Sequence, residues 1–281
     1  RRLICCRGDE PIGVLFSGGV DSVVLAAMGA TILTANPDGP QVLELFNVTF
    51  GCGNAADRRA ALQSFEEMKG LFPNLDLRLI CVDVQDWESV QSHDKHVQQL
   101  ISPKASVMDL NIGTALWFAS RGVGRFNDNP AYESRCRILL LGMGADEQMG
   151  GYTRHRKAYK NGTLRQELDM DIGRLWERNL GRDDRVISDH GKEARFPFLD
   201  PNVVDFLAKT PLDDVCDFDL GPGMGDKRIL RLVAMRMGLL TASGLVKRAI
   251  QFGSRIAHES DKRRFGSRRQ AKGESSIRNI E

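Results

Sequence analysis

Ser17-Gly18-Gly19-Val20-Asp21-Ser22 is the stretch that decides the fold, since it joins an apolar run at residues 12–16 to another at residues 23–28. An apolar strand, a glycine-rich turn and an apolar helix in this order expose several backbone N–H groups at a helix N-terminus, where they hold phosphate oxygens. The two glycines let the backbone approach the anion, and the two serine hydroxyls donate to it. The carboxylate of Asp21 would repel phosphate, so we predict that it holds Mg²⁺.

The alternative for this stretch is a serine-glycine turn that only closes a strand-helix unit. Such a turn has no need of an aspartate and two flanking serines, so the phosphate site is favoured. A Walker A loop is excluded, because no lysine follows the glycines.

A second motif, Leu141-Gly-Met-Gly-Ala-Asp-Glu-Gln-Met-Gly-Gly-Tyr152, lies at the carboxyl end of a strand expected at residues 137–141. Parallel strands bring their carboxyl ends to one edge of a sheet, so Asp21 and Asp146 are expected to converge and to hold Mg²⁺ on a polyphosphate. The alternative is that Asp146 and Glu147 form an acidic pair that complements a helix dipole.

Strands and helices alternate over the first half of the chain, which predicts an α/β fold with a parallel sheet covered by helices on both faces. Further strands are expected at residues 42–50 and 77–84, and helices at residues 57–71, 87–100 and 109–120. In the helix at 57–71, Ala60, Ala61, Phe65, Met68 and Leu71 share one face, whereas Arg58, Arg59, Glu66 and Glu67 are expected to face water.

The second half of the chain is expected to be helical. No strand is predicted from residue 149 onward, and residues 164–180, 201–209 and 226–238 have the pattern of helices. Residues 122–134, rich in Gly, Asn, Asp and Pro, are predicted to form a surface loop. Residues 261–281 are too polar to pack, so a disordered charged tail is expected there.

The composition is that of a globular protein, since 42% of the 281 residues are hydrophobic and 27% are charged. No apolar stretch approaches the length of a membrane span and no signal segment opens the chain, which leaves a cytoplasmic or nuclear protein without a membrane partner, and we expect a cytoplasmic one. The six cysteines show no Cys-x-x-Cys spacing, so neither a zinc site nor a disulfide framework is expected.

The net charge of +2 does not favour nucleic acid as a partner. Residues 258–281 hold seven of the 39 Lys and Arg and four of the 37 Asp and Glu, so the rest of the chain carries 32 basic and 33 acidic side chains. A protein that binds many phosphates is expected to carry a basic face on its folded body.

At the two glycine-rich motifs the chain resembles the synthetase domain of class-B asparagine synthetases, in which both motifs occur in this order and spacing. The resemblance continues through Asp184-Arg185, Gly191-Lys-Glu-Ala-Arg-Phe-Pro-Phe-Leu-Asp200 and Asp226-Lys227-Arg-Ile-Leu-Arg231. It implies one ATP-pyrophosphatase domain of the adenine-nucleotide alpha-hydrolase-like type over residues 1–260, with an α/β part at 10–150 and a helical part at 151–260. It also implies an N-terminal glutaminase domain in the full-length protein.

The resemblance implies a role for each matching residue. Adenine and ribose would be bordered by Phe16, Val48, Leu141 and Gly142, and the nucleotide-binding set also includes Ser17, Gly18, Gly19, Asp21, Ser22 and Gly144. Asp21 and Asp146 would be the Mg²⁺ ligands, and Lys227 and Glu147 the catalytic residues. A desolvated Lys227 would stabilise charge on the phosphates, although spacing alone fits a solvated lysine on an amphipathic helix equally well.

The implied reaction uses ATP with Mg²⁺, aspartate or another carboxylate, and ammonia. The carboxylate attacks the α-phosphorus of ATP and releases pyrophosphate, and ammonia then displaces AMP from the acyl-adenylate to give asparagine.

Two positions depart from the family pattern. Met143 stands where the family has a glutamate that assists the attack of ammonia, and a thioether takes up no proton at neutral pH. Asn111 stands where the family has an arginine that binds aspartate, so a carboxylate clamp is missing unless another arginine such as Arg121 replaces it. Asp109 is either a polar contact at the acceptor site or an exposed helix cap.

The remaining ionisable residues give weaker signals. Glu193 and Arg195 are predicted to pair with each other, and His190 is predicted to be structural. The other histidines lie in polar stretches and are expected to face solvent: His93, His96, His155 and His258.

Three functions are therefore open. The first is an asparagine-synthetase-like ligase supplied with ammonia by a glutaminase domain. The second is an ATP- and Mg²⁺-binding scaffold module without turnover, which Met143 and Asn111 support. The third is a relative that modifies tRNA, for which the basic tail is the one supporting feature.

Overall fold

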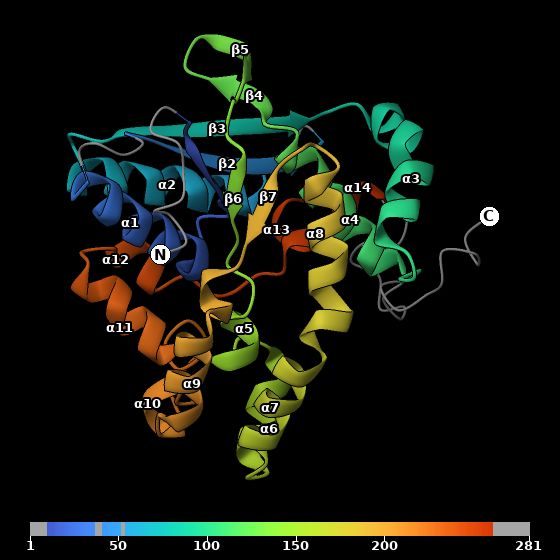
Figure 1. Cartoon of the computed structure of the whole chain (residues 1–281). Coiled ribbons are helices and arrows are strands. Elements are labelled where there is room, and N and C mark those ends of the chain that lie inside the picture. Colours follow the sequence, from blue (N-terminus) through green and yellow to red (C-terminus); the bar gives the residue numbers. More distant parts are fainter. Residues whose placement is uncertain (1–9, 37–40, 52–53, 261–281) are drawn as a thin grey trace.

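A twisted sheet forms the centre of the molecule, shown in Figure 1 as a computed structural model that describes residues 10–36, 41–51 and 54–260. Within these residues the sheet has seven strands in the order β5-β4-β3-β2-β1-β6-β7. They are β1 (Ile12–Leu15), β2 (Val42–Phe50), β3 (Asp76–Val84), β4 (Val123–Phe126), β5 (Asn129–Glu133), β6 (Ile138–Leu140) and β7 (Glu193–Arg195). All neighbours from β3 to β7 are parallel, which confirms the predicted α/β fold.

Helices cover both faces of this sheet (Figure 1). One core packs under α1 (Val20–Thr34), α2 (Ala56–Leu71), α11 (Arg228–Arg236) and α12 (Leu240–Ser243). The opposite core packs under α3 (Trp87–Ile101), α4 (Val107–Ser120) and α8 (Gly181–Ser188). Because side chains alternate along a strand, Leu45 of β2 enters the first core and Phe46 the second.

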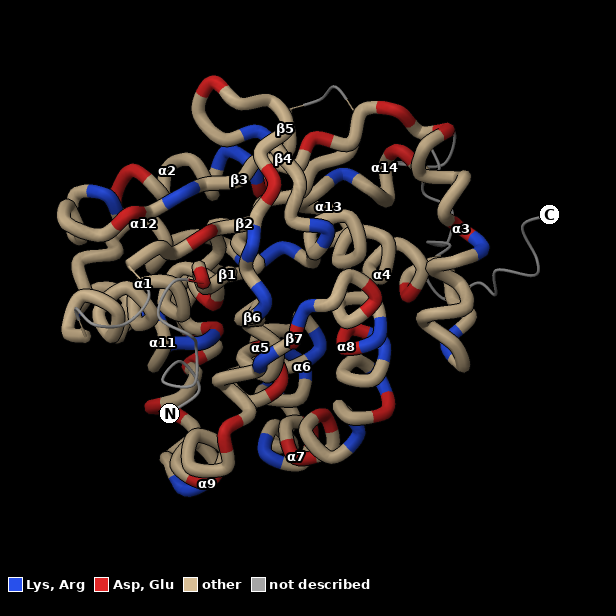
Figure 2. The backbone as a smooth tube through the Cα atoms, turned by 45° about the horizontal axis from the view of Figure 1, so that its top comes forward, with Lys and Arg blue, Asp and Glu red and all other residues tan. Residues whose placement is uncertain are grey.

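The other helices belong mostly to the second half of the chain. They are α5 (Ala145–Gln148), α6 (Thr153–Lys160), α7 (Leu164–Leu175), a π-helix (Trp176–Leu180), a 3₁₀ helix (Pro197–Leu199), α9 (Pro201–Lys209), α10 (Leu212–Val215), α13 (Ile250–Gly253) and α14 (Ile256–Ser260). No helix of the described residues combines the length and the apolarity needed to cross a membrane. Basic and acidic positions are interspersed along the described chain in the view of Figure 2.

The register of the two central strands fixes where the two glycine-rich motifs lie. Val14 of β1 is opposite Leu140 of β6 in a parallel pair, so both chains leave the sheet at the same edge. The first motif then enters α1 and the second enters α5. This edge, at the carboxyl ends of parallel strands, is where ligands bind in open α/β sheets.

Two predictions of the backbone were wrong. Residues 122–134 are not a loop but carry the antiparallel pair β4 and β5, and β4 extends the sheet beside β3. The hairpin is fastened by Glu44, a fully buried carboxylate of β2 that accepts hydrogen bonds from the hydroxyls of Tyr132 (2.6 Å) and Ser134. A strand also follows residue 149, since β7 pairs with β6; its three residues are too few to show an alternating pattern.

The helix predicted at residues 164–180 also changes character along its length. The α-helical part ends at Leu175, and residues 176–180 form the π-helix before α8 begins. A π-helix widens the turn and shifts the direction of the side chains that follow.

Three side chains lie where the sequence did not place them. Arg58 does not face water, because its Nε donates to Asn47 Oδ1 (2.7 Å) and its Nη1 to Asp83 Oδ1 (2.6 Å). Leu71, expected in the core, is 40% exposed. His155 is fully buried, and its Nε2 lies 2.9 Å from Asp171 Oδ2. The neighbours of His155 in the sequence are polar, so the sequence predicted exposure to solvent instead of this buried network.

Asp171 is the centre of that network. It also accepts hydrogen bonds from Arg154 and from Arg174 Nη2 (2.5 Å), and its side chain is 1% exposed. Burial opposes the ionisation of Asp171, but hydrogen bonds from His155, Arg174 and Arg154 outweigh it and lower the pKa of Asp171.

We predict that Asp171→Asn lowers the free energy of unfolding by roughly 2 kcal/mol, because the buried site loses its charge while both arginines stay partly solvated. Since the folded-state pKa of Asp171 is depressed, its contribution is complete above the unfolded-state pKa and is lost as the pH falls through the folded-state pKa. Urea unfolding at pH 7 and at lower pH measures both effects. Asp169→Asn, on the exposed face of the same helix, is the control and should change stability by less than about 0.5 kcal/mol.

An equal loss in both variants, or a wild-type stability that the pH leaves unchanged, would contradict a stabilising role for the Asp171 charge.

Candidate functional site

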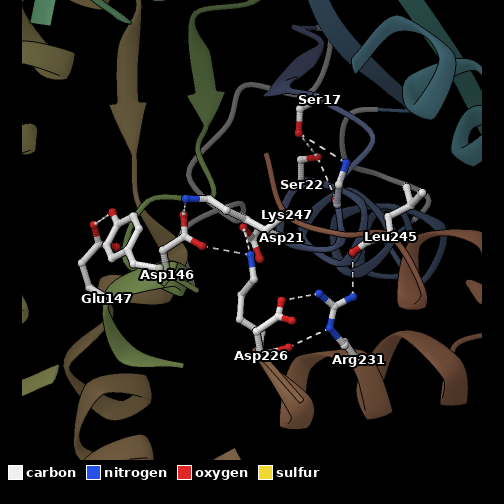
Figure 3. Close-up of polar contacts among 12 residues, drawn as sticks. Ser17, Asp21, Ser22, Asp146, Glu147, Asp226, Arg231, Leu245 and Lys247 are labelled. Atoms are coloured by element: carbon white, nitrogen blue, oxygen red, sulfur yellow. Dashed lines mark hydrogen bonds and ion pairs between the residues drawn. The ribbon is translucent and has the colours of Figure 1, made fainter. Parts of the chain in front are cut away.

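A lysine between two aspartates forms the centre of the candidate site. Lys227 Nζ lies 2.7 Å from Asp21 Oδ2 and 3.0 Å from Asp146 Oδ1, and the lysine side chain is 1% exposed. Lys247 Nζ approaches the other oxygen of Asp146 at 3.3 Å (Figure 3). Asp21 and Asp146 thus converge as the sequence predicts, and the alternative of a solvated Lys227 is wrong.

The backbone explains why Lys227 points inward. It precedes α11 in the left-handed region at φ 53°, and its backbone N–H donates to Met149 O at 2.8 Å. The adjacent Asp226 accepts from Arg231 Nη2 at 2.5 Å, and Arg231 in turn donates to Leu245 O at 2.9 Å (Figure 3). This second ion pair holds the turn that presents Lys227 to the sheet edge.

The charges of the cluster stabilise one another. Burial disfavours ionised Asp146, but the ammonium groups of Lys227 and Lys247 outweigh it and lower the pKa of Asp146 to about 2. Burial raises the pKa of Asp21, and Lys227 offsets only part of this effect. Burial also disfavours charged Lys227, but the two carboxylates outweigh it and raise the pKa of Lys227. The site therefore combines a permanent cation with carboxylates that gain from a further cation.

A cavity of about 480 Å³ opens beside this cluster. Nine predicted site residues line it: Phe16, Ser17, Asp21, Ser22, Val48, Leu141, Gly142, Asp146 and Glu147. Gly18, Gly19, Gly144 and Lys227 do not line it. Apolar and polar side chains from both glycine-rich motifs therefore share one cavity, as a nucleotide with a base and a polyphosphate requires.

The turn after β1 is held by its own serines. Gly19 N–H donates to Ser17 Oγ at 3.3 Å, and Ser22 Oγ donates to Gly19 O at 3.1 Å. Gly18 has φ 79°, and a Cβ atom there would lie 2.2 Å from the backbone nitrogen of Ala61 in α2. Close packing against α2 therefore requires a glycine at position 18, a reason distinct from the predicted approach to an anion.

The two aspartates fit the Mg²⁺ that the sequence implies. Asp21 Oδ1 is buried and has no hydrogen-bond partner among the described residues, so it is a free acidic oxygen at the cavity. The described residues hold no group of three or more His, Cys, Asp or Glu that would enclose a metal by itself. Mg²⁺ is commonly bound by one or two carboxylates together with substrate phosphates and water, which matches this donor set.

Glu147, predicted to be catalytic, is anchored rather than free. Its Oε1 accepts hydrogen bonds from Tyr152 Oη (2.5 Å) and Asn179 Nδ2 (3.2 Å). Burial, followed by the charge of Asp146, raises the pKa of Glu147. The same Asn179 amide lies 3.5 Å from Met143 Sδ, so the π-helix contacts the second motif at two residues.

The departures from the family pattern occupy different places. Met143 lines the cavity, whereas Asn111 does not, and its amide points to Ser260 Oγ (3.4 Å). Arg121 stacks on Trp117 and lies outside this cavity, so it is no substitute clamp. Asp109 lines the cavity but is not an exposed cap, since it is buried and pairs with Arg182 at 2.7 Å.

The remaining ionisable residues agree with the sequence. Glu193 and Arg195 pair at 2.7 Å. His190 packs on Trp117, with ring centroids 4.7 Å apart, and lies outside the cavity.

The sequence patterns did not predict several residues that line the cavity. Lys247, Arg154, Arg178, Asn179 and Arg182 all line it. Lys247 could have been found from the sequence, because it forms a basic pair with Arg248 outside any helical pattern. The others lie on helices, where their charges resemble an ordinary solvated face.

The sequence profile of the family described as asparagine synthase matches residues 3–168 and 159–264 of this chain. Mouse asparagine synthetase domain-containing protein 1 is 38% identical over 296 residues, which cover 90% of this chain and 47% of the mouse protein. An asparagine synthetase domain-containing protein of Saccharomyces cerevisiae is 37% identical over 265 residues, which cover 89% of this chain and 48% of the yeast protein. The chain spans about half the length of these two relatives.

A more distant relative is the glutamine-hydrolysing asparagine synthetase B of Escherichia coli. It is 24% identical over 229 residues, which cover 79% of this chain and 38% of the bacterial protein.

The two glycines of the first motif give a matched pair of variants. We predict that Gly18→Ala destabilises the protein by about 3 kcal/mol, because the new Cβ meets the backbone of α2 and φ is positive. At Gly19 a Cβ would meet only Ser17 Oγ, at 3.4 Å, so Gly19→Ala should change stability by less than about 1 kcal/mol.

Urea unfolding and titration with ATP separate the two effects. If Gly19 serves the approach to an anion, Gly19→Ala folds normally and binds ATP more weakly. A Gly18→Ala variant as stable as the wild type would contradict the close approach of α2.

Proposed function

The chain belongs to the asparagine synthase family, a family of ATP-dependent ligases, and from this we propose that it converts aspartate, ATP and ammonia into asparagine, AMP and pyrophosphate. The observation that carries the proposal is the buried Lys227 between Asp21 and Asp146, because these two aspartates line a cavity that both glycine-rich motifs share.

ATP would occupy the cavity with its base beside the apolar side chains of Phe16, Val48 and Leu141. Its phosphates would lie at the turn of residues 17–22, where the serine hydroxyls and the N-terminus of α1 offer donors. Asp21 and Asp146 would hold Mg²⁺, which when bound neutralises charge on the polyphosphate.

Lys227 would stabilise the transfer step. An oxygen of the substrate carboxylate attacks the α-phosphorus, the bond to the β-phosphate oxygen breaks, and pyrophosphate leaves. A fixed ammonium is effective here because it needs no reorientation as charge develops on the phosphates. Lys247 and Arg154, which also line the cavity, would stabilise the departing pyrophosphate.

The second step would be the attack of ammonia on the acyl carbon, with AMP as the leaving group and loss of one proton. Met143 lines the cavity at the family's glutamate position, and its thioether does not take up this proton. This observation favours a second candidate function, an ATP- and Mg²⁺-binding module without turnover. In the ligase, ammonia would come from a glutaminase domain, which belongs to the proposal for the whole protein.

We predict that the purified protein with ATP, MgCl₂, aspartate and ammonium chloride releases pyrophosphate and forms asparagine. Asp21→Asn should lower Mg²⁺-dependent ATP affinity at least about tenfold, because a metal ligand is lost. Asp205→Asn, an exposed residue of α9, is the matched control and should leave affinity unchanged. Unaltered ATP binding by Asp21→Asn would refute the phosphate site, whereas binding without aspartate-dependent pyrophosphate release would select the module without turnover.

Met143→Glu tests the missing base. We predict that it raises the rate of asparagine formation at least about tenfold, because a carboxylate there accepts the proton that ammonia loses. Asn179 Nδ2, now 3.5 Å from the sulfur, would donate to the new carboxylate. Met143→Leu keeps the volume without a base and should give no gain. A folded Met143→Glu variant with wild-type ATP affinity and no gain would show that the base is not what limits turnover.

A further inference from the structure

We propose that Arg178 binds the second carboxylate of a dicarboxylic amino acid while the first carboxylate is activated. This inference rests on the proposed function and assigns the substrate class of the same cavity. Arg178 belongs to the π-helix and lines the cavity, and the sequence patterns pointed to no role for it.

The family's clamp position does not serve this cavity. Asn111 turns toward α14, where its amide donates to Ser260 Oγ. Three apolar residues of α4 that line the cavity lie one helical turn apart: Met108, Ile112 and Leu116. Asp109 of α4 also lines the cavity, but its carboxylate pairs with Arg182 and would repel a second carboxylate. The apolar stripe fits the hydrocarbon part of a substrate and leaves its distal carboxylate without a partner on α4.

Arg178 differs from the other cavity arginines in its pairing. Arg154 is bound to Glu167 and Asp171, and Arg182 is bound to Asp109 and Asp183. Arg178 is half-buried, and among the described residues no hydrogen bond or ion pair to it is found.

The other basic groups of the cavity also have acidic neighbours. Lys104 lies 3.9 Å from Glu177, and Lys247 lies 3.3 Å from Asp146. Arg248 interacts electrostatically with buried Asp57. Arg178 is therefore the cavity cation with its charge available, and a partly desolvated cation gains from an anionic ligand.

The π-helix explains how Arg178 reaches the chemistry. Its wider turn carries Arg178 and Asn179 to the cavity together. Asn179 contacts both Glu147 and Met143 of the second motif. Its neighbour Arg178 therefore belongs to the end of the cavity beside Met143, which we call the acceptor end, and not to the end where adenine would bind.

The apolar residues of α4 and the guanidinium of Arg178 together indicate the chemistry of the ligand. A guanidinium binds a carboxylate through two parallel N–H···O bonds and fixes its orientation. A dicarboxylic amino acid would place one carboxylate on Arg178 and the other beside the Lys227 cluster, with its methylene group on the α4 stripe. A monocarboxylic amino acid would leave Arg178 unpaired.

Calorimetry on the intact chain, saturated with Mg²⁺ and α,β-methylene-ATP, tests this without turnover. Aspartate should bind wild-type protein, and alanine should bind more weakly. Arg178→Gln should weaken aspartate binding roughly tenfold to a hundredfold and leave nucleotide affinity unchanged, which also reports that the variant is folded. The control Arg236→Gln removes an exposed arginine of α11 and should change neither affinity.

Equal aspartate affinity in Arg178→Gln and wild type, alanine binding as tight as aspartate, or no binding of either would overturn the inference. The proposed function fails separately. If wild-type protein binds aspartate through Arg178 yet releases no pyrophosphate from ATP, the ligase is refuted and the role of Arg178 stands.

Discussion

The ammonium of Lys227 between two carboxylates is the interaction on which the site depends. Asp21 follows β1, Asp146 follows β6, and Lys227 precedes α11, so the cluster joins residues 206 and 81 positions apart. Each of these charges would be costly to bury alone, and together they offset one another's desolvation. The cluster therefore fixes the helical half of the chain against the sheet edge while it shapes the cavity.

The order of the strands makes this cluster possible. Because β1 and β6 are parallel neighbours, two motifs distant in sequence leave the sheet side by side. Each then enters a helix, and the acidic residue lies in the first turn of that helix. A negative side chain is favourable there because of the helix dipole, so the first turns of α1 and α5 favour Asp21 and Asp146 in addition to their ion pairs with Lys227. The helix dipoles and the ion pairs with Lys227 thus both favour negative charge at this edge of the sheet.

The sequence predicted the parts of the fold that local pattern determines. The strand at residues 42–50 and the helix at 201–209 were placed with their correct bounds, since apolar runs, a starting proline and an Asp200 cap mark them. The predictions from the sequence were wrong where tertiary contacts determine the local structure. The three residues of β7 show no alternation, the β4–β5 hairpin depends on buried Glu44, and His155 is buried by its bond to Asp171.

The two ends of the cavity are constrained to different degrees. At the phosphate end nearly every polar group has a structural partner, and Gly18 cannot change without displacing α2. At the acceptor end Met143 is only half-buried, and Arg178 has no ion pair among the described residues. In the proposed ligase, substitutions at the acceptor end would therefore alter which carboxylate is bound, or whether ammonia reacts, at little cost to folding. The departure at Met143 falls in this less constrained region, whereas Asn111 is buried outside the cavity and points to Ser260. A changed acceptor end is therefore physically compatible with the nucleotide site that we propose.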